Sequence, residues 1–347
     1  MSQPSRRQLF LDALAGKPVP RSPVAPLAVH FCARVAGISL NRYTSDPVAL
    51  ADAVICYYDR FRPDAVVISA DTWVSAEAMG ARVGPLAEDQ PWGGLGGPRV
   101  CSPADVRALP PPDPERQGRC PLMLEATRRV AAQIGGETAV IACFDQFPFS
   151  LAAAMMGLTE LMLAIDEAPA LVDALMERCL AQALAYGRAL AGAGADVLTG
   201  GDSPAGLIGP RRYREQVLPF EQRLIAELRA TTRKPVSLHI CGDAHAIVAD
   251  MARSGADMLE IDHRTDLADA CRVAGADTAI WGNLDPVAML SQGDPADVAA
   301  AAQQALTAAV GKRRFILGSG CTLPVETPFA NVDALIVAPQ LSWCTPP

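Results

Sequence analysis

Short apolar runs rich in β-branched residues recur along this chain, and segments with helical periodicity separate them. Near-continuous apolar strands that alternate with helices are typical of a parallel sheet covered by helices on its outer side. Eight such units predict an α/β fold of the (β/α)₈ barrel type. The eight predicted strands are residues 24–31, 65–71, 139–145, 196–202, 235–241, 257–262, 277–285 and 314–319.

Polar side chains gather where these runs stop. In a (β/α)₈ barrel the carboxyl ends of the strands form one face, and that face carries the active site. A single Asp or Asn at such a position often only begins a turn or caps the next helix. Because such residues close almost every run, we predict one ring of functional groups. Its members are His30, Asp71, Asp145, Asp202, His239, Cys241, Asp262, Asn283, Asp285 and Cys321.

The connections between the runs favour a single barrel domain over residues 1–347 with an N-terminal extension. Asp46 followed by Pro47 predicts a helix start, because proline suits the first turn of a helix. Residues 72–137, between the second and third predicted strands, are too many for an ordinary βα connection. We expect them to form a surface excursion or lid.

The composition argues against several classes of protein. The chain has 30 Lys and Arg against 38 Asp and Glu, a formal charge of −8, which is unlike a nucleic-acid-binding body. Its 50% hydrophobic residues suffice for a large core. Apolar runs fall short of the ~18 to 20 residues of a membrane span, and the N-terminus is unlike a secretory signal. The ten cysteines are scattered without a disulfide framework, so we expect a cytoplasmic protein.

The sequence LHICGDAH, residues 238–245, carries the sharpest sign of chemistry. Side chains two apart on a strand project from the same face, so His239 and Cys241 can bind one metal ion. Cys321, in GSGCTLP after the last predicted strand, offers a third soft ligand. One imidazole and two thiolates are a zinc set with one position open, whereas structural sites close with a fourth ligand. Asp262 is a candidate for that position at rest, or else a carboxylate that supports a ligand.

For the His-x-Cys pair alone, a core cysteine beside a hydrogen-bonded histidine is the alternative, and the distant third ligand favours a metal. Zinc deprotonates a bound thiol, whose pKa in solution is about 8.5. Thiolate ligands lower the positive charge of the metal, so the bound sulfur stays reactive towards carbon. The predicted site therefore suits transfer of an alkyl group to sulfur.

At these residues the chain resembles the uroporphyrinogen decarboxylase superfamily, and within it the zinc-dependent corrinoid methyltransferases of the methylcobamide:coenzyme M methyltransferase type. The likeness runs from RRQLFLDALAGKPVPRSPV through Asp71 and LHICGD to GSGCTLPVETP. It implies a (β/α)₈ barrel and zinc bound by His239, Cys241 and Cys321. It also implies transfer of a methyl group from a methylated corrinoid to a zinc-activated thiol such as coenzyme M. Homocysteine, another small thiol or a folate remain open as acceptors.

The resemblance also implies a partner. The sequence contains no DxHxxG cobalamin motif, so we expect a separate corrinoid protein to carry the methylcobalamin. The acceptor is expected to be a small thiol. The residues expected to contact the corrinoid or the acceptor at the barrel mouth are Asp71, Asp145, Asp202, Ser203 and Asn283.

Two alternatives stay open. Tetrapyrrole decarboxylases of the superfamily carry an Arg-Gln-Ala-Gly-Arg element, of which Arg34 here keeps only the first arginine, and an aspartate that Asp71 matches. Loss of basic groups removes the means of neutralising a multiply carboxylated substrate. The other alternative is a non-catalytic zinc barrel that binds a corrinoid protein, although an open metal position favours an enzyme.

Overall fold

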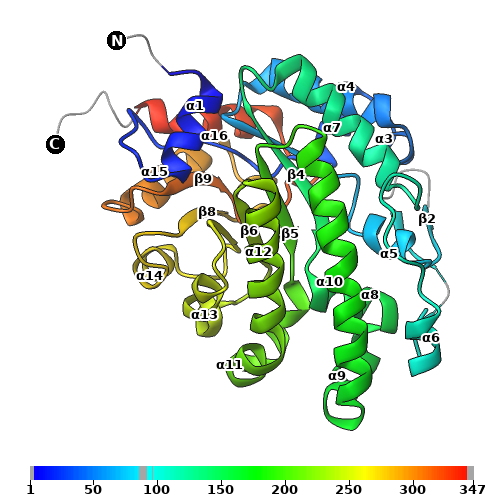
Figure 1. The fold of residues 1–347 in the computed structure, drawn as a ribbon. Coiled ribbons are helices and arrows are strands. Elements are labelled where there is room, and N and C mark those ends of the chain that lie inside the picture. Colours follow the sequence, from blue (N-terminus) through cyan, green and yellow to red (C-terminus); the bar gives the residue numbers. More distant parts are fainter. Residues whose placement is uncertain (1–3, 86–91, 96, 342–347) are drawn as a thin grey trace.

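The structure, a computed structural model, describes residues 4–85, 92–95 and 97–341. Seven parallel strands form one curled sheet, and helices cover its outer side (Figure 1). The predicted α/β barrel architecture is confirmed. In sheet order the strands are β1 (Ala65–Ile68), β4 (Ala139–Gln146), β5 (Val197–Gly201), β6 (Val236–Ile240), β7 (Met258–Ile261), β8 (Ala279–Leu284) and β9 (Phe315–Ser319).

The prediction of a strand over residues 24–31 is wrong. The eighth position of the barrel holds an extended segment that lacks a regular ladder of hydrogen bonds. Pro23 and Pro26 have no backbone N–H to donate to a sheet. Between them, Val24 makes one isolated parallel bridge with Leu317 of β9. On its other side the Val24 carbonyl accepts the amide of Asp64, just before β1, at 2.9 Å. The segment therefore joins the two edge strands and closes the barrel.

A glycine on β9 makes this closure possible. A β-carbon at Gly318 would lie 2.7 Å from the carbonyl oxygen of Ala25, closer than real contacts allow. The buried Trp281 of β8 donates its indole N–H to the same Ala25 carbonyl at 2.8 Å. The closing segment is thus held by backbone bonds and by one buried side chain.

Helices that follow the strands form the outer layer. As the sequence predicts, Asp46 caps α4 (Pro47–Phe61), and its carboxylate accepts the amides of Val48 and Ala49. The 3₁₀ or π turns are η1 (Ser203–Leu207), η2 (Tyr213–Val217) and η3 (His245–Ile247). The other helices outside residues 72–137 are α1 (Arg6–Leu14), α2 (Phe31–Ala36), α3 (Leu40–Ser45), α8 (Pro148–Met156), α9 (Leu158–Glu167), α10 (Pro169–Gly192), α11 (Gly209–Arg212), α12 (Leu218–Thr232), α13 (Val248–Arg253), α14 (Leu267–Val273), α15 (Pro295–Ala308) and α16 (Phe329–Leu341).

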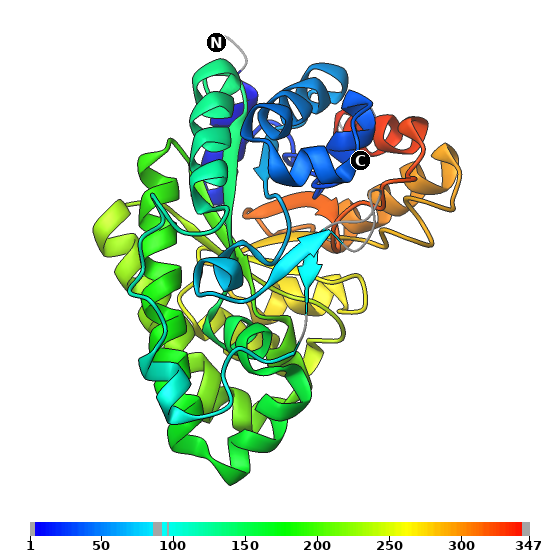
Figure 2. The ribbon, with the colours of Figure 1, turned by 90° about the vertical axis from the view of Figure 1, so that its right-hand side faces the viewer.

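The long connection over residues 72–137 combines one outer helix with an excursion. Its elements are α5 (Val74–Ala78), β2 (Val83–Pro85), β3 (Trp92–Gly94), α6 (Pro103–Arg107) and α7 (Cys120–Ile134). Helix α7 packs against α4 in the outer layer. Strands β2 and β3 form an antiparallel hairpin, which lies in front of the main sheet in Figure 2. Movement of this excursion as a lid stays a prediction.

Helix α1 covers the amino ends of the strands, where it contacts β1, β4 and β9. Arg7 forms a 2.6 Å ion pair with Asp196, just before β5. Arg21 pairs through two bonds of 2.6 and 2.8 Å with the buried Asp64, just before β1. Since this end of the barrel is covered, the carboxyl ends of the strands are the open face.

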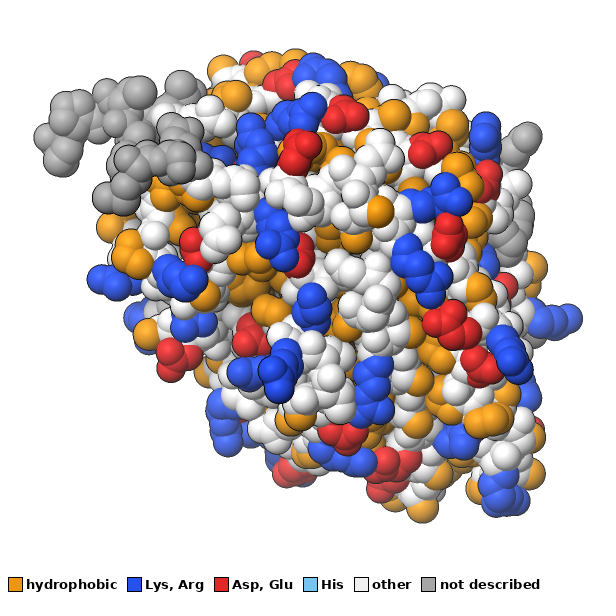
Figure 3. All heavy atoms as spheres, turned by 45° about the horizontal axis from the view of Figure 1, so that its top comes forward, with side chains coloured by type: hydrophobic (Ala, Val, Ile, Leu, Met, Phe, Trp, Pro, Cys, Tyr) orange, Lys and Arg blue, Asp and Glu red, His pale blue; other side chains and the backbone are white. Residues whose placement is uncertain are grey.

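In the described part of the chain, no single helix is long and apolar enough to cross a membrane. Within those residues, α8 and α9 taken together have the length and composition of a span, but a bend of 106° separates them. On the face shown in Figure 3, basic and acidic side chains are intermixed. Ion pairs such as Arg60 with Asp333, at 2.6 Å, also lie at the surface of the protein.

Candidate metal centre and its cavity

The carboxyl end of β6 places two of the predicted ligands together. His239 lies in β6 and Cys241 directly follows it, so their side chains share one face of the strand. His239 Nε2 lies 2.7 Å from Cys241 Sγ, and Cys241 Sγ lies 3.6 Å from Cys321 Sγ. The three possible ligand atoms all lie within 4.8 Å of one another. A soft divalent ion that prefers nitrogen and sulfur fits such a set.

The turn after β9 brings Cys321 to this point. Gly320 donates its amide to the Leu284 carbonyl at 2.7 Å, and a side chain at Gly320 would collide with the backbone of His263. The absence of a side chain lets the turn pass close to the loop after β7. The Gly-Ser-Gly approach to Cys321 therefore has a steric reason.

The three candidate ligands shift one another's pKa values. A hydrogen bond with Cys321 lowers the pKa of Cys241, against the effect of burial. That same contact, together with burial, raises the pKa of Cys321. Burial opposes a charge on His239, but the Glu260 carboxylate and Cys321 together raise its pKa to about 9. Protons on His239 and Cys321 must therefore leave when a metal binds.

A buried carboxylate that the sequence analysis missed stands behind His239. Glu260, 2% exposed, lies on β7 beside His239 in the parallel register. His239 Nδ1 lies 3.1 Å from the Glu260 backbone carbonyl and 3.1 Å from its Oε1. A ligating histidine normally gives its second N–H to such a group, which leaves the other nitrogen for the metal. The sequence did contain a signal for this role, because Glu260 is an acidic residue inside an apolar run. A charged residue that is buried normally has a partner.

Asp262 lies next to the ligands but is engaged elsewhere. Its Oδ2 accepts the amide of Gly242 at 2.8 Å, and its Oδ1 accepts the amide of Arg264 at 2.9 Å. It does not belong to the group of three that the described residues form. In this arrangement its carboxylate holds the loop after Cys241 in place.

The candidate ligands open onto a cavity of about 760 Å³ at the carboxyl ends of the strands. His239, Cys241 and Cys321 form part of its wall, and the excursion after β1 contributes another part through Arg82 and Leu95. Among the residues predicted for the mouth, those that line it are His30, Asp71, Asp145 and Ser203. Ser203 also accepts the amide of Cys241 at 3.3 Å.

Asp71 is neutralised by an arginine from the long connection. Arg119, before α7, makes bonds of 2.5 and 3.1 Å to Asp71 and one of 2.7 Å to Glu77. Asp71 is 4% exposed and Arg119 is 8% exposed. No spacing in the sequence indicated this partner, because 47 intervening residues separate the pair.

Two other predicted mouth residues do not line the cavity. Asp202, fully buried, accepts the amide of Ser150 at 2.6 Å. Asn283 donates to the carbonyls of Thr265 and Asp262 at 2.8 and 3.1 Å. Both positions hold neighbouring loops together, which is the capping and turn role that any single polar residue at a strand end often has.

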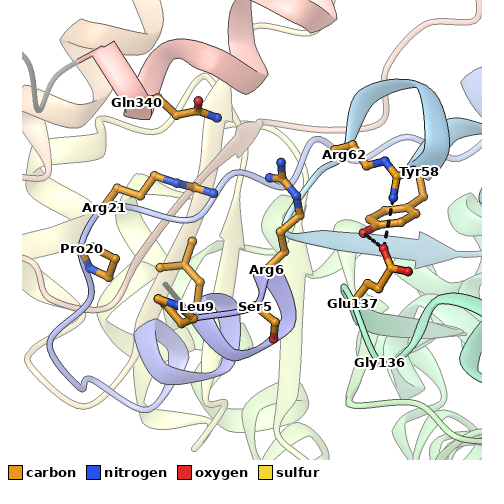
Figure 4. A pocket seen from close by; sticks show the side chains of 11 residues that line it. Ser5, Arg6, Leu9, Pro20, Arg21, Tyr58, Arg62, Gly136, Glu137 and Gln340 are labelled. Atoms are coloured by element: carbon orange, nitrogen blue, oxygen red, sulfur yellow. Dashed lines mark hydrogen bonds and ion pairs between the residues drawn. The ribbon is translucent and has the colours of Figure 1, made fainter. Parts of the chain in front are cut away.

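A second cavity, of about 730 Å³, lies at the amino ends of the strands (Figure 4). Arg6, Arg21, Arg62 and Glu137 line it. Glu137 accepts the Tyr58 hydroxyl at 2.7 Å and Arg62 at 3.1 Å. This cavity therefore lies between helix α1 and the ion pair of Arg62 with Glu137. It is at the opposite end of the barrel from the candidate ligands.

A family model described as uroporphyrinogen decarboxylase (URO-D) matches residues 5–340. The chain belongs to the uroporphyrinogen decarboxylase family. In three dimensions it is similar to a methyltransferase from Methanosarcina mazei, with a TM-score of 0.89, 23% identity and coverage of 98% of this chain and 99% of the other. That likeness shows the fold.

Relatives in this family have two kinds of name. A methylcobamide:CoM methyltransferase MtbA of Methanosarcina mazei is 34% identical over 225 residues, 63% of each chain. A methylcobamide:CoM methyltransferase MtaA of Methanosarcina barkeri is 27% identical over 97% of this chain and 98% of its own. A uroporphyrinogen decarboxylase of Syntrophotalea carbinolica is 30% identical over 82% of this chain and 84% of its own. Membership of the family is therefore compatible with methyl transfer and with decarboxylation, and the residues of the site must distinguish the two reactions.

Proposed function

We propose that this protein is a methyltransferase that moves a methyl group from a methylated corrinoid to a zinc-activated thiol. The observation that carries the proposal is the group formed by His239, Cys241 and Cys321 in the wall of a large cavity. One nitrogen and two sulfurs suit zinc and leave one coordination position for a substrate. The relatives named methylcobamide:CoM methyltransferase support the same reaction.

Zinc in this site would keep a coordinated thiol ionised at neutral pH. The residues of the chain orient the three ligands. Glu260 holds the His239 ring through Nδ1, and Ser203 and Asp262 hold the backbone of Cys241 and Gly242. We retain Asp262 as the candidate for the fourth position before a thiol enters. The cavity walls orient the thiol and limit its motion, which favours reaction along one direction.

The donor in this proposal is methylcobalamin carried by a separate corrinoid protein, which meets the open face of the barrel. Asp71, Asp145 and Ser203 are proposed to contact the corrinoid or the acceptor, because they line the cavity. Asp202 and Asn283 are proposed to act by holding the loops around it. Coenzyme M is the acceptor in the relatives' names. We place the protein in the cytoplasm, because its nine described cysteines are free thiols.

Tetrapyrrole decarboxylation is the second candidate, since relatives of comparable identity carry that name. The positions of two residues disfavour it. Asp71 is occupied by Arg119, and Arg34 donates to the carbonyls of Val325 and Thr327, both at 2.9 Å. Neither is free to bind a polycarboxylated tetrapyrrole in this arrangement.

Metal analysis combined with methylcobalamin demethylation tests the proposal. We expect about one zinc per chain and thiol-dependent loss of the methyl-cobalt absorption band. Cys241→Ser and Cys321→Ser should lose most of the zinc and at least ~100-fold in rate, because each removes one of three ligands. The matched control is Cys56→Ser, an exposed free cysteine, which should retain both. Full methyl transfer by zinc-free protein, or decarboxylation of uroporphyrinogen, would contradict the proposal.

A further inference from the structure

We infer that the thiol accepted in this cavity carries no anionic group, so that its remaining atoms are uncharged or positively charged. The inference rests on the proposed function and narrows its substrate class. It follows from the charges of the cavity wall and from the partners that those charges already have.

The wall contains more acids than bases. Its acidic members are Asp71, Asp145, Glu160 and Glu260. Among the described residues that line the cavity, Arg82 is the one arginine or lysine, and its side chain is exposed to solvent. His30 also lines the cavity, but burial lowers the pKa of its imidazole. An anion in this cavity would therefore meet few positive charges.

The nearest buried cation is already engaged. Arg119 lies behind the wall, where Nη1 and Nη2 bond to Asp71 and Nε bonds to Glu77. One guanidinium thus faces two carboxylates, so this cluster has no positive charge left for a ligand. An arginine that binds an anionic ligand would normally present a free, forked pair of N–H groups to it.

Two residues of the wall have buried oxygens without a hydrogen-bond partner. They are Asp145 Oδ1 and Gln146 Oε1, which have almost no exposed surface. Asp145 is 2% exposed, and its other oxygen accepts the amide of Ser75 at 2.7 Å. Among the described residues it is also one of three besides glycine with a positive φ, 67°, a conformation that is uncommon for residues other than glycine. Burial raises the pKa of its carboxyl group, so Asp145 supplies no positive charge that could pair with an anion.

The metal centre adds no positive charge once the thiol is bound. Two cysteine thiolates balance the charge of a zinc ion, and a substrate thiolate makes the sum negative. The Glu260 carboxylate lies directly behind His239. An additional sulfonate or carboxylate on the acceptor would be buried without a cation to pair with, which lowers its affinity.

Three thiols of one length distinguish the charge classes. They are 2-mercaptoethanol, 2-aminoethanethiol and 2-mercaptoethanesulfonate, which end in a hydroxyl, an ammonium and a sulfonate group. Their dissociation constants are measured on protein loaded with Co²⁺, through the thiolate-to-cobalt absorption that appears when a thiol binds, and their KM values in methylcobalamin demethylation. We expect the sulfonate to bind at least ~10-fold more weakly than the other two, a difference of 1.36 kcal/mol.

A charge-reversal variant tests whether the wall sets this preference. Glu160→Lys, at an exposed residue of α9 that lines the cavity, should improve binding of the sulfonate relative to the hydroxyl thiol. Asp173→Lys is the matched control, because Asp173 is exposed on α10 and does not line the cavity. Equal or tighter binding of the sulfonate by the unchanged protein overturns the inference, and so does an unaltered preference in Glu160→Lys. Failure of all three thiols to bind or react would overturn the proposed function itself.

Discussion

Beyond the three candidate ligands, Glu260 is the residue that should most affect metal binding. It is buried on β7, and both its backbone carbonyl and its side chain lie 3.1 Å from His239 Nδ1. Two acceptors on one nitrogen favour the tautomer or charge state in which Nδ1 carries the proton. The Nε2 lone pair is then available to a metal.

Glu260→Gln should weaken zinc binding by about tenfold, the lower end of the range for such supporting groups, because the backbone carbonyl remains. Competition with a chromogenic chelator measures the affinity. Glu227→Gln is the control, because Glu227 is half-exposed and paired with Arg188 on the outer surface. An unchanged zinc affinity in Glu260→Gln would show that the carbonyl alone orients the ring.

Two further buried carboxyl groups, those of Asp202 and Glu221, lie between secondary-structure elements. Asp202, which follows β5, accepts the amide of Ser150 near the start of α8. Glu221 of α12 accepts the Tyr213 hydroxyl at 2.5 Å. Both carboxyl groups are fully buried. Burial raises the pKa of Asp202 to about 7, and burial together with Asp202 raises that of Glu221. These elements are therefore joined by acids that prefer to keep their protons.

This pair predicts a pH-dependent stability. Because the folded-state pKa of Asp202 exceeds its ordinary value, the folded state binds more protons than the unfolded chain, and stability falls as pH rises towards 7. Asp202→Asn cannot ionise, so its stability relative to the parent should rise by roughly 2 to 3 kcal/mol between pH 5 and 8. Urea unfolding at both pH values measures the difference. Asp173→Asn, exposed on α10, should show no such trend, and a flat difference for Asp202→Asn would refute the prediction.

At the scale of the whole molecule, the candidate ligands connect distant parts of the barrel. Cys241 follows β6, whereas Cys321 follows β9, and 80 positions separate them. The closing segment around Val24 bonds to β9 on one side and to the residue before β1 on the other. A metal at the mouth would thus hold together strands that are not neighbours in the sheet.

Zinc removal should therefore lower the thermal stability of the entire barrel. Free zinc at 1,000 times its dissociation constant contributes about 4 kcal/mol to the folded state, which for a chain of this size corresponds to a Tm shift of roughly 5 °C. Calorimetry before and after chelation measures the shift. Cys321→Ser should melt at the same temperature with and without zinc. Equal melting temperatures for the loaded and stripped parent would contradict a bound metal.

Much of the fold and half of the site follow from local pattern. Seven of the eight apolar runs form strands, because apolar runs that alternate with helical segments leave little choice of architecture. The His-x-Cys spacing on one strand predicts that His239 and Cys241 point the same way, since side chains alternate along a strand. The prediction for the first run is wrong because Pro26 within it and Pro23 just before it lack the N–H groups that a ladder needs.

Only the tertiary structure decided which distant groups meet. The sequence by itself determined the barrel, the end of the strands where the candidate ligands gather and the pair His239 and Cys241 at the end of β6. The meeting of Cys321 with that pair, the partner of Asp71 and the carboxylate behind His239 depend on strand order and on the path of the long connection. Periodicity records which way a side chain points relative to its own strand. It contains no information about what another segment places opposite that side chain.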